Sequence, residues 1–285
     1  MSISGTGTQA DPYIVDTWAD FVTAVETADA YVKVDTSTVV TWDFAQMVEG
    51  GLSTGINWNA VEVDGNGLTI KGLFGTATRW FSGTSATAKV MKNLNLLDMA
   101  KTTVTTGVFY GRAIEFRNCK FSGVIEGGNF FETYSGAATF TTGSIDGNDP
   151  KGCAFAFNFS GNSKLTSSAC IFNHCNMNFD GESTYTSTHD MKMYESKISG
   201  KMPWASFKNS GGGQNVIDAE IDTIDTWSNT SGGVTLINTD KLASGLSVPS
   251  GFTGVTTTQM LDADALEAVG FIVETEETEE TEGGE

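Results

Sequence analysis

The sequence predicts an all-β protein whose chain winds as a parallel β-helix, and three observations lead to this fold class. First, 33 glycines against four prolines, with abundant Thr, Ser and Asn, are typical of short strands joined by tight corners. Second, apolar residues alternate with polar ones in short runs, which is the period of a half-buried strand. Third, a similar pair of such runs around a polar corner recurs at steps of roughly 19 to 30 residues.

The segment VEVDGNGLTIKGLF, residues 61–74, shows why this recurrence matters. Val61, Val63, Leu68 and Ile70 flank an Asp-Gly-Asn-Gly corner. Such a corner between alternating apolar residues is the strongest local signal of a hairpin, and taken alone the segment predicts one. A meander of hairpins does not require a similar corner at the observed spacing, whereas a coil with one corner per turn does.

Related segments carry the repeat along the chain. They read VMKNLNLLDM from residue 90, AIEFRNCKFSG from 113, ACIFNHCNMNFDG from 169, MKMYESKISG from 191, NVIDAEIDTI from 215 and GVTLINTDKL from 233. The residues expected at the corners are Asp64, Asn93, Asn118, His174, Glu195, Ala219 and Asn238, with Asp146 in the wide gap after 118. Stacking each turn on the preceding one satisfies the backbone groups and fills the interior with apolar side chains. Asparagine tolerates left-handed backbone and can stack as a ladder, so the corner asparagines are assigned a structural role.

Aromatic residues and cysteines are expected inside the coil. Phe155, Phe157 and Phe159 alternate along one run, which places their rings on one face of a strand. The four cysteines contain no CxxC pair and lack the density of a disulfide scaffold, so free, buried thiols are expected.

Both ends of the coil are expected to be capped, because an open end exposes unpaired strand edges. A short amphipathic helix is predicted behind Thr17, with apolar residues at helical spacing: Trp18, Phe21, Val22 and Val25. A second helix is predicted from Gln259 to Val269, with Gly270 as its stop and these residues on its apolar side: Met260, Leu261, Leu266 and Val269.

Four regions follow from these features. Residues 1–55 form an N-terminal capping module, 56–250 the β-helix, 251–273 the C-terminal capping helix region, and 274–285 an acidic tail. The tail, ETEETEETEGGE, carries seven of the negative charges of a chain whose formal net charge is −19. Such a charge run predicts a disordered, solvated segment.

Charge and hydropathy also limit the expected partners and location. An acidic surface repels phosphate backbones, so no nucleic acid is expected. No apolar run approaches membrane-spanning length, and the N-terminus lacks a basic start followed by an apolar core. We therefore expect no membrane partner, and a chain synthesised in a cytoplasm without a signal peptide.

Several of these segments resemble a known class of proteins. VEVDGNGLTIKGL and VMKNLNLLDM are similar to segments of right-handed parallel β-helix proteins of the pectate-lyase and tailspike kind. GTGTQADPYIVDTWADFVTAV and TTTQMLDADALEAVGF resemble the first and last elements of β-helix proteins found in gut bacteria and their phages. The resemblance covers about a third of the chain and implies a single-stranded, right-handed coil. It indicates function poorly, since one fold hosts unrelated activities.

Catalysis on a polysaccharide would need two carboxylates across a groove. The candidates are carboxylates on successive predicted turns: Asp190, Glu195, Asp218 and Glu220 foremost, with Asp180, Glu182, Asp222 and Asp225 beside them. Solvated surface charges are the alternative interpretation, and the one we favour. Asn238-Thr239-Asp240 matches a motif of polygalacturonase-like β-helices. The paired aspartates, Gly-His-Gly and Arg-Ile-Lys that follow it there are missing, so the match is interpreted as coincidence.

Binding sites are indicated only weakly. Trp204 and Trp227 are candidate platforms for stacking sugar rings, with burial as the alternative that we favour. His174 and His189 have no metal-ligand spacing, and neither the Asp-Gly-Asn-Gly segment nor the Asp-Gly-Asn-Asp segment completes a calcium loop. The sequence therefore predicts no metal site and no cofactor.

The resulting expectation is a structural protein on the surface of a bacteriophage virion, of the head-fibre, decoration or tail-spike type. Its expected partners are other virion proteins and host or mucosal glycans, and the resemblance implies a homotrimer. One alternative is a tailspike-like depolymerase, a glycoside hydrolase or polysaccharide lyase that uses a carboxylate pair on one face of the coil. A second alternative is a non-catalytic bacterial adhesin or carbohydrate-binding module.

Overall fold

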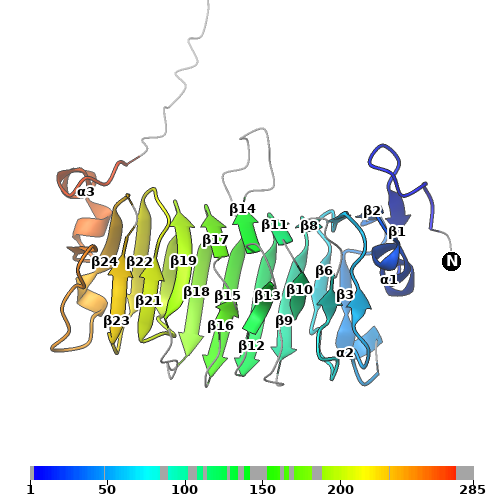
Figure 1. Cartoon of the computed structure of the whole chain (residues 1–285), viewed down its shortest axis with the longest axis horizontal. Coiled ribbons are helices and arrows are strands. Elements are labelled where there is room, and N and C mark those ends of the chain that lie inside the picture. Colours follow the sequence, from blue (N-terminus) through cyan, green and yellow to red (C-terminus); the bar gives the residue numbers. More distant parts are fainter. Residues whose placement is uncertain are drawn as a thin grey trace, which may run out of the picture.

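The structure is a computed structural model that describes residues 3–47, 49–83, 89–101, 108–111, 114–126, 129–133, 138–141, 153–160, 164–166, 170–181, 188–230 and 232–273. These residues form a mostly β protein with three long parallel sheets, here named A, B and C. Figure 1 shows the strands side by side along the long axis of the molecule, with a helix near each end.

The strands of each sheet follow one another in chain order. Sheet A contains β1 (Tyr13–Val15), β2 (Tyr31–Val34), β5 (Glu62–Asp64), β8 (Lys89–Lys92), β11 (Ile114–Arg117), β14 (Ala138–Thr141), β17 (Cys170–Asn173), β19 (His189–Tyr194), β21 (Ser206–Asn209) and β23 (Thr226–Asn229). Sheet B contains β3 (Thr41–Asp43), β6 (Thr69–Lys71), β9 (Asn95–Lys101), β12 (Lys120–Glu126), β15 (Ala154–Ser160), β18 (Asn176–Gly181), β20 (Lys197–Lys201), β22 (Asn215–Glu220), β24 (Thr235–Asn238) and β25 (Thr253–Val255). Sheet C contains β4 (Ile56–Asn57), β7 (Phe81–Ser82), β10 (Phe109–Gly111), β13 (Asn129–Thr133) and β16 (Lys164–Thr166).

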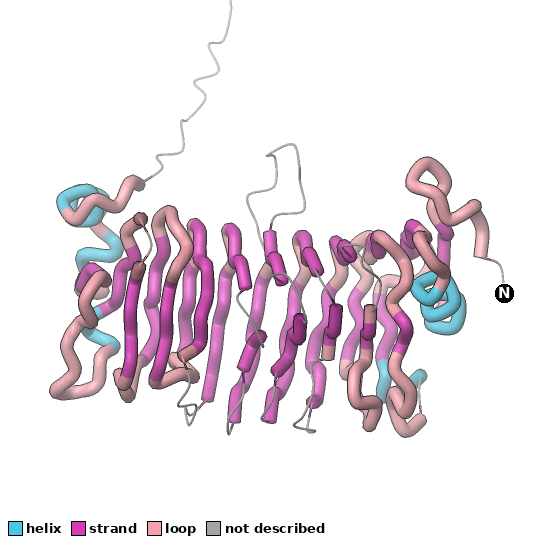
Figure 2. The backbone as a smooth tube through the Cα atoms, in the orientation of Figure 1, coloured by secondary structure: helices cyan, strands magenta, loops and turns pink. Residues whose placement is uncertain are grey.

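The chain visits the sheets in circuits. From β5 to β18 the order is A, B, C, repeated, and β19 to β24 alternate between A and B. Each strand pairs with the strands one circuit before and after it, and the tube in Figure 2 shows these circuits stacked along one axis. All pairings between the named strands are parallel. The segment 61–74 is therefore not a hairpin, because β5 and β6 belong to different sheets.

The predicted corners between sheets A and B are confirmed in five circuits. The corner residues with left-handed backbone are Asn66, Asn93, Asn118, His174 and Glu195, with φ between 47° and 54°. In the first of these circuits Asn66 takes this conformation in place of the predicted Asp64, which ends β5. Their backbone turns the chain sharply between two strands, and asparagine adopts this conformation at low cost.

The prediction is wrong for the later circuits. Ala219 lies inside β22, whose strand runs without a corner, and the turn between β21 and β22 is made by the glycines before Asn215. Asn238 ends β24 with an extended backbone and caps a short 3₁₀ helix, η1 (Thr239–Lys241). Asp146 lies outside the described residues.

Side-chain amides link the corners of neighbouring circuits. The Asn118 Nδ2 group donates to Asn93 Oδ1 at 2.9 Å, and the Asn93 Nδ2 group donates to Asp64 Oδ1 at 3.1 Å. Asp64 Oδ1 also accepts from the backbone N–H of Asn66 at 2.9 Å. This ladder confirms the structural role predicted for the corner asparagines and shows that the Asp-Gly-Asn-Gly segment is turn-making.

The interior is apolar and aromatic. Phe155, Phe157 and Phe159 all point inward, as predicted. The four cysteines are free and buried, also as predicted. The register of β12, β15 and β18 aligns the residues that precede these strands, so that Cys119, Cys153 and Cys175 form one buried column. Burial raises the pKa of the Cys119 and Cys153 thiols, which keeps both protonated.

The N-terminal helix forms as predicted. Helix α1 (Trp18–Glu26) begins after Thr17, whose hydroxyl oxygen accepts a hydrogen bond from the backbone N–H of Asp20 at 3.2 Å. Its buried face includes Phe21 and Val25. A single turn, α2 (Phe44–Met47), follows β3.

The C-terminal helix is shorter than predicted. It is broken into η2 (Gln259–Leu261) and α3 (Ala263–Ala268), because the Asp262 carboxylate accepts from the first backbone N–H groups of α3 and starts a new helix there. Leu266 packs against sheet B, but Leu261 is 86 % exposed, so the predicted apolar face is only partly buried. Gly270, with φ of 81°, follows the last turn as predicted.

Candidate functional site

The four foremost carboxylate candidates lie on different parts of the molecule. Asp218 and Glu220 are two residues apart on β22 and face outward from sheet B. Asp190 belongs to β19 of sheet A, where it contacts Lys208 at 3.5 Å. Glu195 lies at a corner, and its Oε1 atom accepts from the backbone N–H of Gln214 at 2.9 Å. The structure therefore brings only Asp218 and Glu220 to one face.

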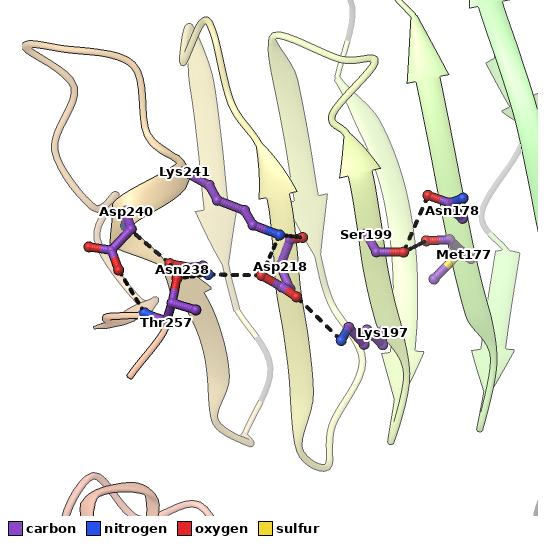
Figure 3. A network of polar contacts seen from close by, with 9 residues as sticks. All are labelled: Met177, Asn178, Lys197, Ser199, Asp218, Asn238, Asp240, Lys241 and Thr257. Carbon is purple, nitrogen blue, oxygen red and sulfur yellow. Dashed lines mark hydrogen bonds and ion pairs between the residues drawn. The ribbon is translucent and has the colours of Figure 1, made fainter. Parts of the chain in front are cut away.

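Asp218 is the centre of a polar network on the outer face of sheet B (Figure 3). Lys241 Nζ lies 2.7 Å from Asp218 Oδ1, and Lys197 Nζ lies 3.4 Å from Oδ2. The Asn238 Nδ2 group donates to Asp218 Oδ1 at 2.8 Å and to Thr257 Oγ1 at 3.0 Å. The network joins β20, β22 and β24 to the segment that leads into the C-terminal cap.

The network fixes the protonation state of Asp218. Burial alone would raise the pKa of this carboxyl, but hydrogen bonds from Lys241 and Asn238 and the charges of Lys241 and Lys197 lower it below its ordinary value. A carboxyl held ionised in this way cannot act as a general acid near neutral pH. Asp218 could serve only as a base, a nucleophile or a structural anchor.

Among the four foremost candidates, Glu220 and Asp218 are the only two that lie on the same face. The backbone positions of residues two apart on a strand are separated by about 6.6 Å, and inverting glycosidases hold their two carboxyl groups about 6.5–9.5 Å apart. Glu220 is exposed, whereas Asp218 is held by two lysines and an amide. This geometry favours an anchoring role for Asp218.

The Asn238-Thr239-Asp240 motif has a structural explanation. The Asn238 side chain caps η1 by accepting from the backbone N–H of Asp240 at 3.1 Å. Asp240 Oδ2 accepts from the backbone N–H of Thr257 at 2.8 Å. These bonds fasten the C-terminal segment to β24, in agreement with the interpretation of the motif as coincidence.

The two tryptophan candidates do not offer sugar-stacking faces. Trp204 is 1 % exposed and packs against Phe159 and Phe179 inside the coil. Trp227 is 8 % exposed, and its Nε1 group donates to the Ala205 carbonyl at 2.9 Å. The alternative of burial is confirmed for both rings.

A groove of about 460 Å³ on the outer face of sheet B was missed by sequence reasoning. It crosses β9, β12, β15 and β18, and its lining residues are Asp98, Met99, Ala100, Ser122, Gly123, Val124, Ala156, Phe157, Asn158, Asn178, Phe179 and Asp180. Its volume falls within the range of about 300–1,000 Å³ that is usual for ligand sites.

A β-bulge shapes one end of the groove. Leu96 pairs with Phe121 and Met99 pairs with Gly123, so β9 holds one residue more than β12 over this interval. Asp98 takes left-handed backbone, with φ of 53°, and its N–H donates to Ser122 Oγ at 3.0 Å. Gly123 is required because a Cβ there would overlap the Met99 carbonyl oxygen.

Small side chains line the floor of the groove, and polar side chains line the end that lies away from the β-bulge. Ser122 and Ala156 occupy the same register row of β12 and β15, where a larger residue would fill the depression. Asn158 and Asp180 lie in the next row, and both are exposed. Neither side chain has a hydrogen bond or ion pair within the described part of the chain, so both can bind a ligand.

No group of three or more His, Cys, Asp or Glu side chains suited to a metal ion occurs among the described residues. His174 is exposed at its corner, and the side chain of His189 lies outside the description. No helix in the described ranges is both long and apolar enough to cross a membrane. The prediction that the chain needs no cofactor stays a prediction.

Comparisons with models of protein families, with curated proteins and with solved structures find no match to this chain. The fold and the site define its class: a mostly β protein of stacked parallel strands with a groove, lined by apolar and polar residues, on the outer face of one sheet.

Proposed function

We propose that the chain is a single-stranded, right-handed parallel β-helix that serves as a structural protein of the bacteriophage virion surface, of the head-fibre, decoration or tail-spike type, and that contacts host or mucosal glycans through sheet B. The resemblance of the corner and end segments to β-helix proteins of gut bacteria and their phages supports the lineage. The handedness and the phage assignment rest on that resemblance.

The observation that carries the proposal is the unbroken stacking of circuits. Two sheets of ten parallel strands run the length of the body, and every rung is hydrogen-bonded to the next. Cooperative pairing along one axis makes a stiff body that can hold a binding face away from a particle. A homotrimer of such bodies in contact with other virion proteins is the assembly we propose.

The groove on sheet B supports the glycan contact. Amide and carboxylate side chains such as Asn158, Asn178 and Asp180 offer both donors and acceptors, which suits the hydroxyl groups of sugars. The groove crosses four strands, and three strand spacings of about 4.8 Å give it a length of roughly 14 Å. An extended oligosaccharide fits such a shape.

The virion assignment is tested by mass spectrometry of purified phage particles from a bacterium that carries the gene. We expect peptides of this chain to co-purify with the particles through a density gradient, and antibody to label the particle surface. Recovery of the chain from the bacterial envelope, and its absence from particles, would overturn the virion role and support the adhesin alternative.

A second candidate, a depolymerase, is favoured by one observation: Asp218 and Glu220 face outward from a single strand. Incubation with the capsular polysaccharide of the host would release reducing ends if this pair were catalytic. Glu220→Gln would abolish that release, whereas Glu115→Gln, on sheet A, would leave it unchanged. We expect no release from the unaltered protein.

A further inference from the structure

We infer that the groove on sheet B selects glycans that carry no carboxylate, and that a sugar with a protonated amine binds it most tightly, opposite Asp180. The inference rests on the proposed glycan contact and specifies its chemical class. It follows from the charges and the hydrogen-bonding groups that line the groove.

The lining contains two carboxylates and no cationic side chain. Asp98 stands at the bulge and Asp180 at the far end, and no Lys or Arg belongs to the residues that line the groove. Lys71 lies 3.7 Å from Asp98, in an exposed pair that contributes little. On the neighbouring strand, β20, Lys201 pairs with Asp222 at 2.8 Å.

Asp180 is the charged side chain that a ligand in the groove would contact. Its side chain is exposed and makes no ion pair with the described residues, so its acceptor sites are open. Asn158 lies beside it in the same register row, and its amide is also uncommitted. A ligand amine could donate to Asp180 while its hydroxyl groups exchange hydrogen bonds with the amide.

A ligand carboxylate would experience the opposite effect. Like charges brought together in a binding site weaken binding, and the overall formal charge of −19 adds to the repulsion. A uronate or sialate bound in the groove would face Asp180, and Asp98 with its exposed partner Lys71, and no cation belongs to the lining residues. We therefore expect affinity to fall by about tenfold from an amine-bearing to an acidic oligosaccharide of equal length.

The test compares three oligosaccharides of matched length with the full chain by isothermal titration calorimetry. The probes are a chitosan oligomer, its fully N-acetylated counterpart and an oligogalacturonate, at a mildly acidic pH at which the amines are protonated. We expect the chitosan oligomer to bind tightest and the oligogalacturonate weakest. The difference should shrink in high salt because exposed charges are then screened.

Variants assign the selectivity to the groove. Asp180→Asn should weaken binding of the chitosan oligomer by about tenfold and strengthen binding of the oligogalacturonate. Glu220→Gln removes the same charge from the outer face of sheet B outside the groove, and should leave the ranking unchanged. Ala156→Tyr fills the groove floor and should abolish binding of all three probes, whereas Glu220→Tyr, on the same face two strands beyond β18, should not.

The outcomes separate the inference from the proposed function. Equal affinity for the three probes, lost in Ala156→Tyr, would overturn the selectivity and leave the glycan contact standing. Binding that survives Ala156→Tyr would overturn the groove as the site. Binding of none of the probes would overturn both the selectivity and the glycan contact, but would not bear on the virion role, which particle composition tests.

Discussion

Replacement of Phe116 should cost several kcal/mol of stability, whereas replacement of its neighbour Glu115 should cost almost none. Phe116 is fully buried, and its ring lies 5.1 Å from that of Phe109 and 5.3 Å from that of Phe121, with edge-to-face geometry in both pairs. Glu115 points outward from the same strand and pairs with Arg117 at 2.9 Å. The two positions therefore compare the two faces of one strand.

The magnitude follows from the buried area. A phenylalanine buries about 150–250 Å², which at about 25 cal/mol per Å² corresponds to roughly 4–6 kcal/mol. Alanine retains a small part of this area, so we expect Phe116→Ala to lower the free energy of unfolding by about 3–5 kcal/mol. Glu115→Ala removes a half-buried ion pair at the surface of the sheet and should cost less than about 1 kcal/mol.

A charged side chain at the buried position should lower the stability more than alanine does. Phe116→Asp would bury an unpaired carboxylate, which costs more than a domain can offset from its net stability of about 5–15 kcal/mol. The same holds for Ile114→Asp, because Ile114 also points inward. Circular dichroism during urea and thermal unfolding would measure the effects. Equal losses for Phe116→Ala and Glu115→Ala, or a folded Phe116→Asp variant, would refute the inward assignment of this strand face.

Three further predictions concern the corners, the ion network and the ends. Asn93→Ala should lower the free energy of unfolding by about 2 kcal/mol, because it forces left-handed backbone on alanine and removes the amide hydrogen bonds to Asp64 and Asn118. Asn93→Gly removes the same hydrogen bonds but tolerates the backbone conformation, so it should cost less. Thermal melts of the two variants would measure the difference. The folded state lowers the pKa of Asp218, so the carboxylate contributes stability above the ordinary aspartate pKa of 3.8, and this contribution is lost as the pH falls through the folded-state pKa. Asp218→Asn should therefore flatten the acid end of a curve of unfolding free energy against pH. An unchanged slope there would contradict the network. Removal of residues 274–285 should leave the melting temperature unchanged, because this charge run holds no apolar residue to pack; a clear drop would mean that the tail contributes to the fold.

The regular corners could be predicted because each has its own local chemistry. Asn93 and Asn118 stand between two short alternating runs, and a residue that tolerates left-handed backbone there has few other uses. The prediction is wrong at Ala219, where NVIDAEIDTI has the same alternation but forms one continuous strand. Alternation reports which face a side chain takes, and it does not report where a strand ends.

The groove could not be predicted because its parts have no common signal in the sequence. Asp98, Ala156 and Asp180 come from three strands, and stacking alone brings them to one face. Nothing in the sequence around Ala156 indicates that this residue lines a groove, because its neighbours on the sheet come from other circuits. Conversely, Asp190 and Asp218 look equivalent as carboxylates of alternating runs, but they face outward from different sheets.

The sequence by itself determined the mostly β character, the turn positions at the asparagine corners, the inward phenylalanines and the N-terminal cap, because periodicity, backbone preference and helix capping act over a few neighbouring residues. Only the tertiary structure decided which of the predicted corners do not form, which carboxylates share a face and where a groove opens. Those properties depend on the register between circuits, and register is set by backbone hydrogen bonds and core packing between residues that are 34 positions apart for β12 and β15 and 22 apart for β15 and β18.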